Sequence, residues 1–271
     1  MATLKQATVQ ANTPLAPGSR LLRLRMVTPT ELGFHGGQYI IVHTHLVRND
    51  GSRVKRTYSI VSDDRAQQHF ELAIQAISTG SRFMTELEPG AILNFSGPWG
   101  RKPPLDGQGP VYFIATDSGI TTTLGLLAPL ACASPLSALH ILWLRPAKAP
   151  FATVDWVRHR LPKALSNALK VVDCDPPAPA SVPAEATVTN AKGLGPAFAF
   201  DHSAQERAQQ AVRLAQQWLA TCPLLQPAKT RVILSGDGLV ICALHKHFLD
   251  QGVSPQNIIQ ENFFNKPPKA R

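Results

Sequence analysis

Cysteine is scarce in this chain, and its few copies are scattered. No two of them form a Cys-x2-Cys pair among the 271 residues; they are Cys132, Cys174, Cys222 and Cys242. Zinc sites and iron–sulfur clusters usually take closely spaced cysteines, so the sequence argues against both within this chain. A disulfide framework is typical of small secreted domains. We therefore expect the four thiols to act as small, buried apolar side chains.

Long apolar runs are also absent. The longest, near residues 124–132, is interrupted by Gly125 and Pro129 and is too short to span a bilayer. The first ten residues, MATLKQATVQ, lack the apolar core of a signal peptide. We therefore expect a cytoplasmic protein without a membrane span.

Acidic residues are few compared with basic ones. The chain has 18 Asp and Glu residues against 27 Lys and Arg residues, which gives a formal net charge of +9 at pH 7. Such an excess favours an anionic partner, which could be nucleic acid, a membrane surface, an acidic protein or a phosphorylated ligand. The basic residues are dispersed and are not interleaved with stacking aromatic residues, so nucleic acid is the weakest of these interpretations.

The first hundred residues are typical of an antiparallel β-barrel. Short β-rich runs bounded by Gly, Asp and Asn predict strands at residues 20–26, 38–44, 54–61, 70–77 and 91–95. One helix is expected from Ser81, as its N-cap, to Leu87, with Pro89-Gly90 as its stop. Many short strands with a single helix favour a barrel.

After the Gly- and Pro-rich residues 97–110, continuous apolar runs alternate with helices. The pattern predicts strands at residues 111–115, 139–144, 169–173, 231–234 and 257–261, and helices at residues 120–131, 154–160, 203–219 and 239–250. This alternation predicts a doubly wound parallel sheet. We therefore expect two domains, residues 1–103 and 110–271, with a Pro/Ala/Gly-rich insertion near residues 176–200 of the second.

The most informative motif is Arg56-Thr57-Tyr58-Ser59, within the strand predicted at residues 54–61. Alternate side chains of a strand share a face, so Arg56 and Tyr58 point one way and Thr57 and Ser59 the other. An arginine beside an aromatic ring suits a ligand that has both a phosphate and a flat heterocycle, as a flavin nucleotide does. An ordinary half-exposed strand would give the same tetrapeptide, so the motif is weak when taken alone.

Three turns add to this motif. Gly80-Ser81-Arg82 begins the helix of the barrel, where backbone N–H groups attract anions and Arg82 adds positive charge. An ordinary serine N-cap is the alternative interpretation of this segment. The other two turns each join a buried strand to a helix, where doubly wound sheets bind nucleotides. They are Thr116-Asp117-Ser118-Gly119 and Ser235-Gly236-Asp237-Gly238.

In this order, the motifs resemble those of the ferredoxin–NADP reductase superfamily across nearly the whole chain. The matching segments are Gly37-Gln38-Tyr39, Arg56-Thr57-Tyr58-Ser59, Gly80-Ser81, Gly97-Pro98-Trp99-Gly100 and Glu261-Asn262-Phe263. The segment from Gly80 to Met84 is most similar to reductases that serve aromatic-ring oxygenases, although the ferredoxin domain that these often carry is not expected here.

The resemblance is weaker at the two turns of the second half. The family's Gly-Gly-x-Gly-Ile-x-Pro corresponds to residues 116–122, where Gly119 and Ile120 match and Thr122 stands in the place of proline. The family's Cys-Gly-Pro corresponds to Ser235-Gly236-Asp237. Asp117 and Asp237 add carboxylates near the expected pyrophosphate, which is unfavourable unless these side chains act as caps or point away.

The resemblance implies a flavoprotein oxidoreductase that passes electrons from NADPH or NADH through a bound flavin to an acceptor. The flavin is expected to be FAD, with FMN as the alternative. The expected acceptor is a ferredoxin-type or oxygenase partner, and the positive charge favours an acidic redox protein. A ferric chelate or free flavin remains open as acceptor. The rival interpretation is a flavin-binding subunit with a degenerate nicotinamide site, acting as an electron relay or a structural partner.

Individual roles are also carried over from the resemblance. Arg56 would bind the flavin phosphate, Tyr58 would pack on the flavin ring and Ser59 would lie near its N5 atom. Ser81 would hold pyrophosphate, and Ser235 and Glu261 would shape the nicotinamide pocket. The expected catalytic residues are Ser59, Ser235 and Glu261, and no metal site is expected. The expected cofactor-binding residues are Gln38, Tyr39, Arg56, Thr57, Tyr58, Ser59, Gly80, Ser81, Arg82, Thr116, Ser118, Gly119, Arg145 and Gly236.

Overall fold

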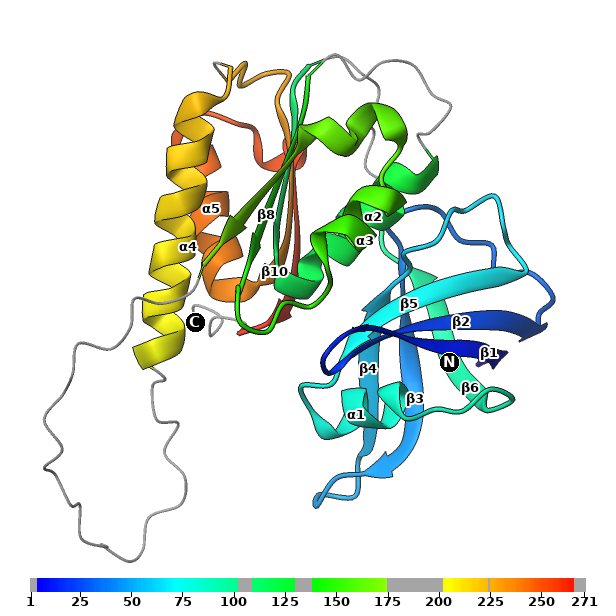
Figure 1. Cartoon of the computed structure of the whole chain (residues 1–271). Coiled ribbons are helices and arrows are strands. Elements are labelled where there is room, and N and C mark those ends of the chain that lie inside the picture. Colours follow the sequence, from blue (N-terminus) through cyan, green and yellow to red (C-terminus); the bar gives the residue numbers. More distant parts are fainter. Residues whose placement is uncertain (1–3, 102–108, 130–137, 175–201, 224, 266–271) are drawn as a thin grey trace, which may run out of the picture.

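Two sheets, one antiparallel and one parallel, lie side by side in the computed structural model (Figure 1). The structure describes residues 4–101, 109–129, 138–174, 202–223 and 225–265. The insertion expected near residues 176–200 and most of the expected linker therefore lie outside the described residues, as does Cys132. In the described part, no helix has the length and apolar character needed to cross a membrane.

The first sheet is a six-stranded antiparallel barrel. Its elements are β1 (Lys5–Ala16), β2 (Ser19–Thr28), β3 (Tyr39–Val47), β4 (Arg53–Ser59), β5 (His69–Gln75), α1 (Thr79–Thr85) and β6 (Ile92–Trp99). The strand order is β4-β3-β6-β1-β2-β5. An antiparallel bridge between Ile60 and Leu72 brings the two outer strands together. Alternate residues of the strands, such as Leu22, Leu24 and Met26, fill the barrel core.

Two features of the barrel differ from the sequence prediction. β1 was not predicted, because its sequence is largely polar and only Ala7 and Val9 are buried; pairing with β2 and β6 holds it in place. The N-cap of α1 is Ser78 and not Ser81. Ser78 has an extended backbone and its side chain accepts a hydrogen bond from the Ser81 N–H, so Ser81 is the third helical residue of a capping box.

The second sheet is parallel and has helices on both faces, which confirms the predicted fold class. Its elements are β7 (Val111–Thr116), the 3₁₀ turn η1 (Asp117–Gly119), α2 (Ile120–Leu127), β8 (Leu139–Arg145), α3 (Val154–Arg160), η3 (Lys163–Ala168), β9 (Leu169–Asp173), α4 (His202–Thr221), β10 (Arg231–Asp237), α5 (Gly238–Asp250), η4 (Pro255–Asn257) and β11 (Ile258–Phe264). The strand order is β11-β10-β7-β8-β9.

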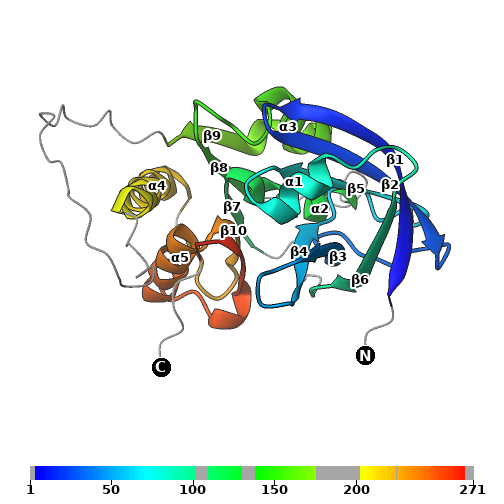
Figure 2. The ribbon, with the colours of Figure 1, turned by 90° about the horizontal axis from the view of Figure 1, so that it is seen from below.

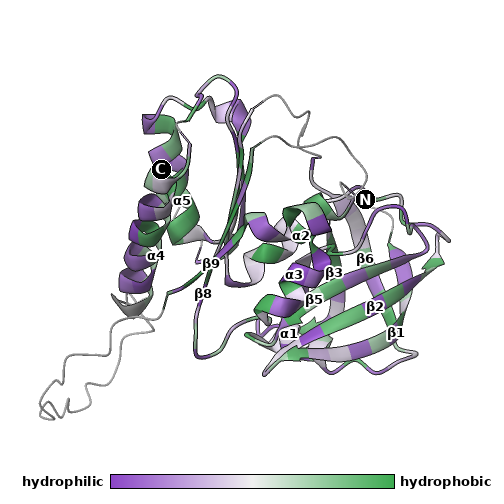
Figure 3. Cartoon of the chain, turned by 45° about the horizontal axis from the view of Figure 1, so that its top comes forward, coloured by the Kyte–Doolittle hydropathy of each residue, from purple (hydrophilic) through white to green (hydrophobic). Residues whose placement is uncertain are grey.

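Burial on both faces explains the apolar runs of this sheet. All six residues of β7 are buried. One face packs with α2 and α3, and the other packs with α4 and α5. Figure 2 shows α4 and α5 on the side of the sheet away from the barrel. Figure 3 shows apolar residues along the parallel strands and an outward hydrophilic surface on α4.

Helix α2 joins the two halves of the molecule, and all eight of its residues are buried. Two glycines permit the close approach. A Cβ at Gly125 would lie 2.2 Å from the Ile60 carbonyl oxygen, and a Cβ at Gly37 would lie 2.3 Å from Leu126 Cδ2. Arg160 of α3 adds an ion pair with Glu71 of β5. These contacts set the position of the parallel sheet relative to β4, and a cavity opens between them.

Candidate active site

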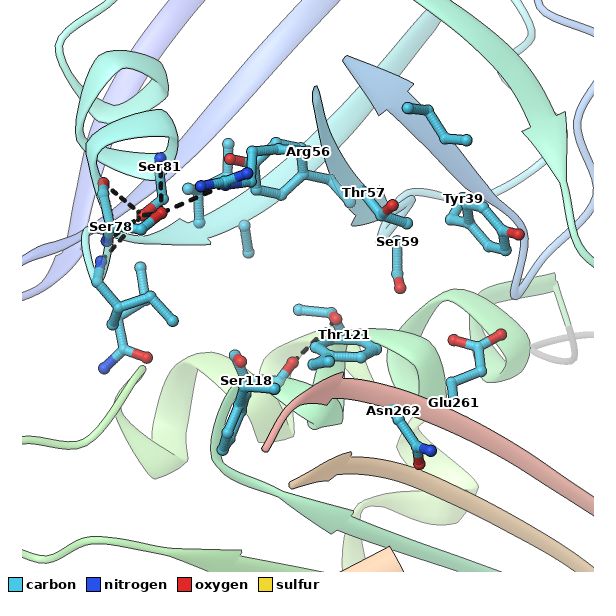
Figure 4. A pocket seen from close by; sticks show the side chains of 18 of the residues that line it. Tyr39, Arg56, Thr57, Ser59, Ser78, Ser81, Ser118, Thr121, Glu261 and Asn262 are labelled. Carbon is cyan, nitrogen blue, oxygen red and sulfur yellow. Dashed lines mark hydrogen bonds between the residues drawn. The ribbon is translucent and has the colours of Figure 1, made fainter. Parts of the chain in front are cut away.

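A cavity of about 710 Å³ lies between the edge strand β4 and the carboxyl ends of the parallel strands (Figure 4). The barrel wall consists of Tyr39, Ile41, Lys55, Arg56, Thr57, Tyr58, Ser59, Ala73, Ile74, Gln75, Ile77, Ser78 and Ser81. The opposite wall consists of Ser118, Thr121, Gln260, Glu261, Asn262, Phe263 and Phe264. The Arg-Thr-Tyr-Ser motif and the Glu-x-Phe segment therefore face the same space, although about two hundred residues separate them in the chain.

The four motif residues of β4 make contacts in opposite directions, as alternation requires. Tyr58 packs against the barrel core and Arg56 contacts Ser78 before α1. Ser59 instead contacts Thr122 of α2 and is buried, whereas Thr57 is exposed at the cavity. Because β4 is an edge strand, side chains of both its faces reach the cavity.

One end of the cavity gathers a guanidinium group and two hydroxyl groups. Arg56 Nε donates to Ser78 Oγ over 3.3 Å. A Cβ at Gly80 would lie 2.8 Å from Arg56 Nε, so glycine leaves the space that the arginine occupies. The Ser81 hydroxyl accepts from the N–H groups of Ile77 and Ser78, each over 2.9 Å, and thus shapes the turn. Arg82 is exposed and does not line this cavity.

Glu261 is the carboxylate of the opposite wall. Thr122 Oγ1 donates to Glu261 Oε2 over 2.8 Å, and Ser59 Oγ lies 3.3 Å from Thr122 Oγ1. Burial raises the pKa of Glu261, and the hydrogen bond from Thr122 opposes that rise. Ser59 and Glu261, two of the three expected catalytic residues, are therefore linked through a residue that the sequence analysis did not assign to the site.

Two buried polar atoms beside the cavity have no hydrogen-bond partner among the described residues. They are Tyr58 Oη and Asn262 Oδ1. Burial also raises the pKa of Tyr58, so its hydroxyl stays protonated and can donate. Buried polar atoms normally have partners. A ligand with polar groups along a flat body would supply them, and this fits a flavin nucleotide whose phosphate lies near Arg56.

The third expected catalytic residue, Ser235, lies elsewhere. It is fully buried in β10, and its hydroxyl donates to the Gly119 carbonyl oxygen over 2.8 Å. A Cβ at Gly119 would lie 2.2 Å from the Ser235 carbonyl oxygen, and one at Gly236 would lie 2.2 Å from Thr116 Oγ1. These four residues pack the two turns together, and none of them lines the large cavity.

A smaller cavity of about 160 Å³ lies beside these turns. Its lining includes Thr116, Asp117, Arg145, Cys174, Arg207, Asp237 and Phe264, and Phe264 also lines the large cavity. Arg145 Nε donates to Asp173 Oδ1 over 2.9 Å, and its guanidinium lies 5.3 Å from the Trp143 ring centroid. The expected nucleotide residues Thr116 and Arg145 therefore lie together at this second cavity.

Asp117 serves the turn of η1 more than the cavity. Its φ of 45° is left-handed, and its carboxylate Oδ1 accepts from the Phe151 N–H over 3.2 Å. The contact joins η1 to the segment before α3. Burial raises the pKa of Asp117 to about 6.

Gln38 also makes structural contacts. Its side-chain amide donates to the Gly100 carbonyl oxygen over 2.9 Å and accepts from the His35 N–H over 2.8 Å.

Several polar residues of this site were not assigned from the sequence, among them Lys55, Ser78, Thr122 and Asn262. Ser78 and Lys55 line the barrel wall, Asn262 lines the opposite wall, and Thr122 lies behind it. Ser78 carries a local signal, the Ser-x-x-Ser spacing of a capping box. Lys55 adjoins the motif in β4, and Asn262 lies within the Glu-x-Phe segment. Thr122 carries no local signal, because its partners are distant in the chain.

Comparisons with known proteins agree with this arrangement. Residues 6–102 match the family model described as an oxidoreductase FAD-binding domain. Over 143 residues, the chain is 32% identical to ferredoxin–NADP reductase B of Sorangium cellulosum, a match that covers 51% of this chain and 57% of that protein. It is 29% identical over 143 residues to reductase component 2 of terephthalate 1,2-dioxygenase from a Comamonas species, covering 40% of that protein. The matches thus span about half the length of these curated relatives.

The similarity of fold extends over nearly the whole chain. The cytochrome b5 reductase domain of Ulva prolifera nitrate reductase has a TM-score of 0.67 and 15% sequence identity, with 96% of this chain and 97% of that chain covered. This similarity of fold extends beyond the FAD-binding segment to the parallel sheet and its helices. The sequence match to the FAD-binding family therefore covers residues 6–102, and the similarity of fold covers nearly the whole chain.

Proposed function

We propose that this protein is an NAD(P)H-dependent flavoprotein reductase that passes electrons through bound FAD to a protein acceptor. The observation that carries the proposal is the large cavity, where Arg56, Tyr58 and Ser59 face Glu261 and Asn262 across the junction of the two sheets. When bound, FAD accepts hydride from a nicotinamide and returns electrons to an acceptor. The protein supplies binding, orientation and control of protons.

The barrel wall would hold the flavin. Arg56, beside Ser78, supplies the cation for a phosphate group, and such charge-assisted contacts are about twice as strong as neutral ones. Tyr39 and Tyr58 supply aromatic surface, and the unpartnered Tyr58 hydroxyl supplies a donor. Ser59 and Glu261 would hold the protons that accompany electron transfer, because both lie at the cavity and are linked by Thr122.

The nicotinamide nucleotide would approach from the carboxyl ends of β7, β8 and β10. These strand ends line the smaller cavity, which adjoins the large one at Phe264. In open parallel sheets, ligands bind at this edge. The sequence-matched relatives are named as reductases, so the comparisons favour an intact reductase over a flavin-binding subunit without nicotinamide binding.

An acidic redox protein, such as a ferredoxin or an oxygenase component, is the acceptor that we propose. The relatives include a ferredoxin–NADP reductase and a reductase component of a dioxygenase. The chain carries a net charge of +9, and Lys55 and Arg56 lie at the cavity. Opposite charge increases the rate of encounter between redox partners.

Anaerobic titration tests this function directly. The purified protein is expected to carry yellow flavin, or to take up FAD on reconstitution. Its flavin absorbance should then bleach when NADH or NADPH is added and recover when an oxidised ferredoxin is added. Flavin that stays oxidised under both nucleotides would contradict the reductase function, and failure to bind any flavin would contradict the flavoprotein assignment.

A further inference from the structure

A hydrogen-bonded line of three side chains crosses the junction between the two sheets. Ser59 Oγ of β4 lies 3.3 Å from Thr122 Oγ1 of α2, which donates to Glu261 Oε2 of β11 over 2.8 Å. A threonine hydroxyl has a single proton to donate. An ionised Glu261 can only accept, so in that state the Thr122 proton points to Glu261 and the Ser59 hydroxyl is the donor toward Thr122. Serine, threonine and carboxylate therefore form one ordered series.

Thr122 differs from both of its partners in exposure. Ser59 and Glu261 line the large cavity, whereas Thr122 is 1% exposed and lies behind its wall. A ligand in the cavity can reach the two ends of the series and not its centre. The adjacent Thr123 is also buried, but its Oγ1 has no hydrogen-bond partner among the described residues. Burial of a threonine in α2 therefore does not by itself produce such a series.

We propose that Thr122 is a positioning residue of this site, whose hydroxyl holds the Glu261 carboxyl group and the Ser59 hydroxyl in fixed relation across the cavity. The inference rests on the proposed reductase function, in which Ser59 and Glu261 hold the protons that accompany electron transfer. Thr122 occupies the place where the sequence resemblance led us to expect proline, and a proline side chain has no donor for Glu261. At position 122 this chain therefore has a hydroxyl group, whereas the proline of the family motif has none.

The hydrogen bond from Thr122 affects the ionisation of Glu261, because the buried surroundings of Glu261 disfavour its charged form. Burial raises the pKa of Glu261, and the Thr122 hydroxyl lowers it. The other ionisable side chains that line the cavity are Tyr39, Lys55, Arg56 and Tyr58. On α5, which packs against β11, His245 contacts Gln260. Without the Thr122 donor, the carboxylate is less favoured, and the proton affinity of Glu261 should rise by roughly tenfold.

Three variants of the full chain test the proposal. Thr122→Val keeps the shape and removes the hydroxyl, Thr122→Ser keeps the hydroxyl, and Thr123→Val is the matched control in the same helix. The infrared carboxyl band that disappears in Glu261→Gln reports the protonation of Glu261 and needs no flavin. Its midpoint should rise by about one pH unit in Thr122→Val and should stay unchanged in the other two variants. Thr122→Ala replaces the valine variant if that one does not fold.

The flavin-loaded enzyme provides the second measurement. Thr122→Val should lower kcat by roughly tenfold with KM for the nicotinamide nearly unchanged, and Thr122→Ser should restore it, because a positioning defect appears in turnover more than in binding. Equal behaviour of Thr122→Val and Thr123→Val in both measurements, or failure of serine to restore either, would overturn the proposal. If the parent chain binds no flavin, the proposed function fails, and the infrared titration alone decides the role of Thr122.

Discussion

Arg56 donates a hydrogen bond from its Nε atom to the Ser78 hydroxyl over 3.3 Å, and this contact joins β4 to the residue that caps α1. Arg56 also donates from Nη1 to the Lys55 carbonyl oxygen over 2.9 Å. The absence of a side chain at Gly80 leaves room for the guanidinium. The cation at the end of the large cavity is therefore held in place before any ligand binds.

Arg56→Ala should lower the affinity for FAD by roughly ten- to a hundredfold, because a charge-assisted phosphate contact contributes about 1.5–3 kcal/mol. Flavin retained after dialysis, and the dissociation constant of the reconstituted protein, measure the change. Arg53→Ala is the matched control, since Arg53 is exposed on the same strand and does not line the cavity. Equal flavin affinity in the two variants would refute the phosphate role of Arg56.

Gly125→Ala should destabilise the protein, although alanine is the better helix former by about 1 kcal/mol. The new Cβ would lie 2.2 Å from the Ile60 carbonyl oxygen, so α2 or the end of β4 must move. Such overpacking costs about 1–3 kcal/mol. Urea denaturation measures the change. Gly33→Ala is the control variant. Gly33 has a φ of 72° and open space around it, so its substitution tests backbone strain without the steric collision expected at Gly125. A more stable Gly125→Ala protein would show that the junction tolerates the methyl group.

Asp117→Asn should raise stability near neutral pH and flatten its dependence on pH. The pKa of Asp117 is raised by burial to about 6, so the folded state binds the proton more tightly than the unfolded chain. Stability from this group is therefore present at low pH and is lost as pH rises from about 4 to about 6. Asparagine keeps the acceptor for the Phe151 N–H and tolerates the left-handed φ.

Thermal unfolding from pH 4 to pH 8 measures this difference. Asp117→Ala is the companion variant, because it removes the acceptor as well as the charge and should be less stable than Asp117→Asn throughout. The interpretation is wrong if the parent and Asp117→Asn lose stability in parallel across that range.

The rate of acceptor reduction should fall steeply with salt if the acceptor is an acidic protein. Exposed charges are screened within about 10 Å at 0.1 M ionic strength. Flavin reduction by saturating nicotinamide should change far less, because it occurs inside the assembled site. Stopped-flow measurement of both steps across a salt series tests this, with a neutral quinone as the comparison acceptor. The same weak salt dependence for ferredoxin and quinone would argue against electrostatic steering by the +9 charge.

Local pattern determined the fold class and one wall of the site. Strands buried on both faces, such as β7, need continuous apolar runs, and alternation with helices then predicts a parallel sheet. The period of two along β4 sends Arg56 and Ser59 in opposite directions whatever surrounds them. These features are short-range consequences of backbone geometry, so they can be predicted from a few consecutive residues.

Contacts between distant segments were decided by the tertiary structure. Thr122 and Glu261 are 139 positions apart, and no local pattern predicts their hydrogen bond. Ser235 has the same residue type as Ser59, yet β10 buries its hydroxyl against Gly119 while β4 leaves Ser59 at the cavity. A side chain's chemistry is set by its residue type, but its exposure and partners depend on which elements pack against it, and here the packing of α2 between the two sheets decides both.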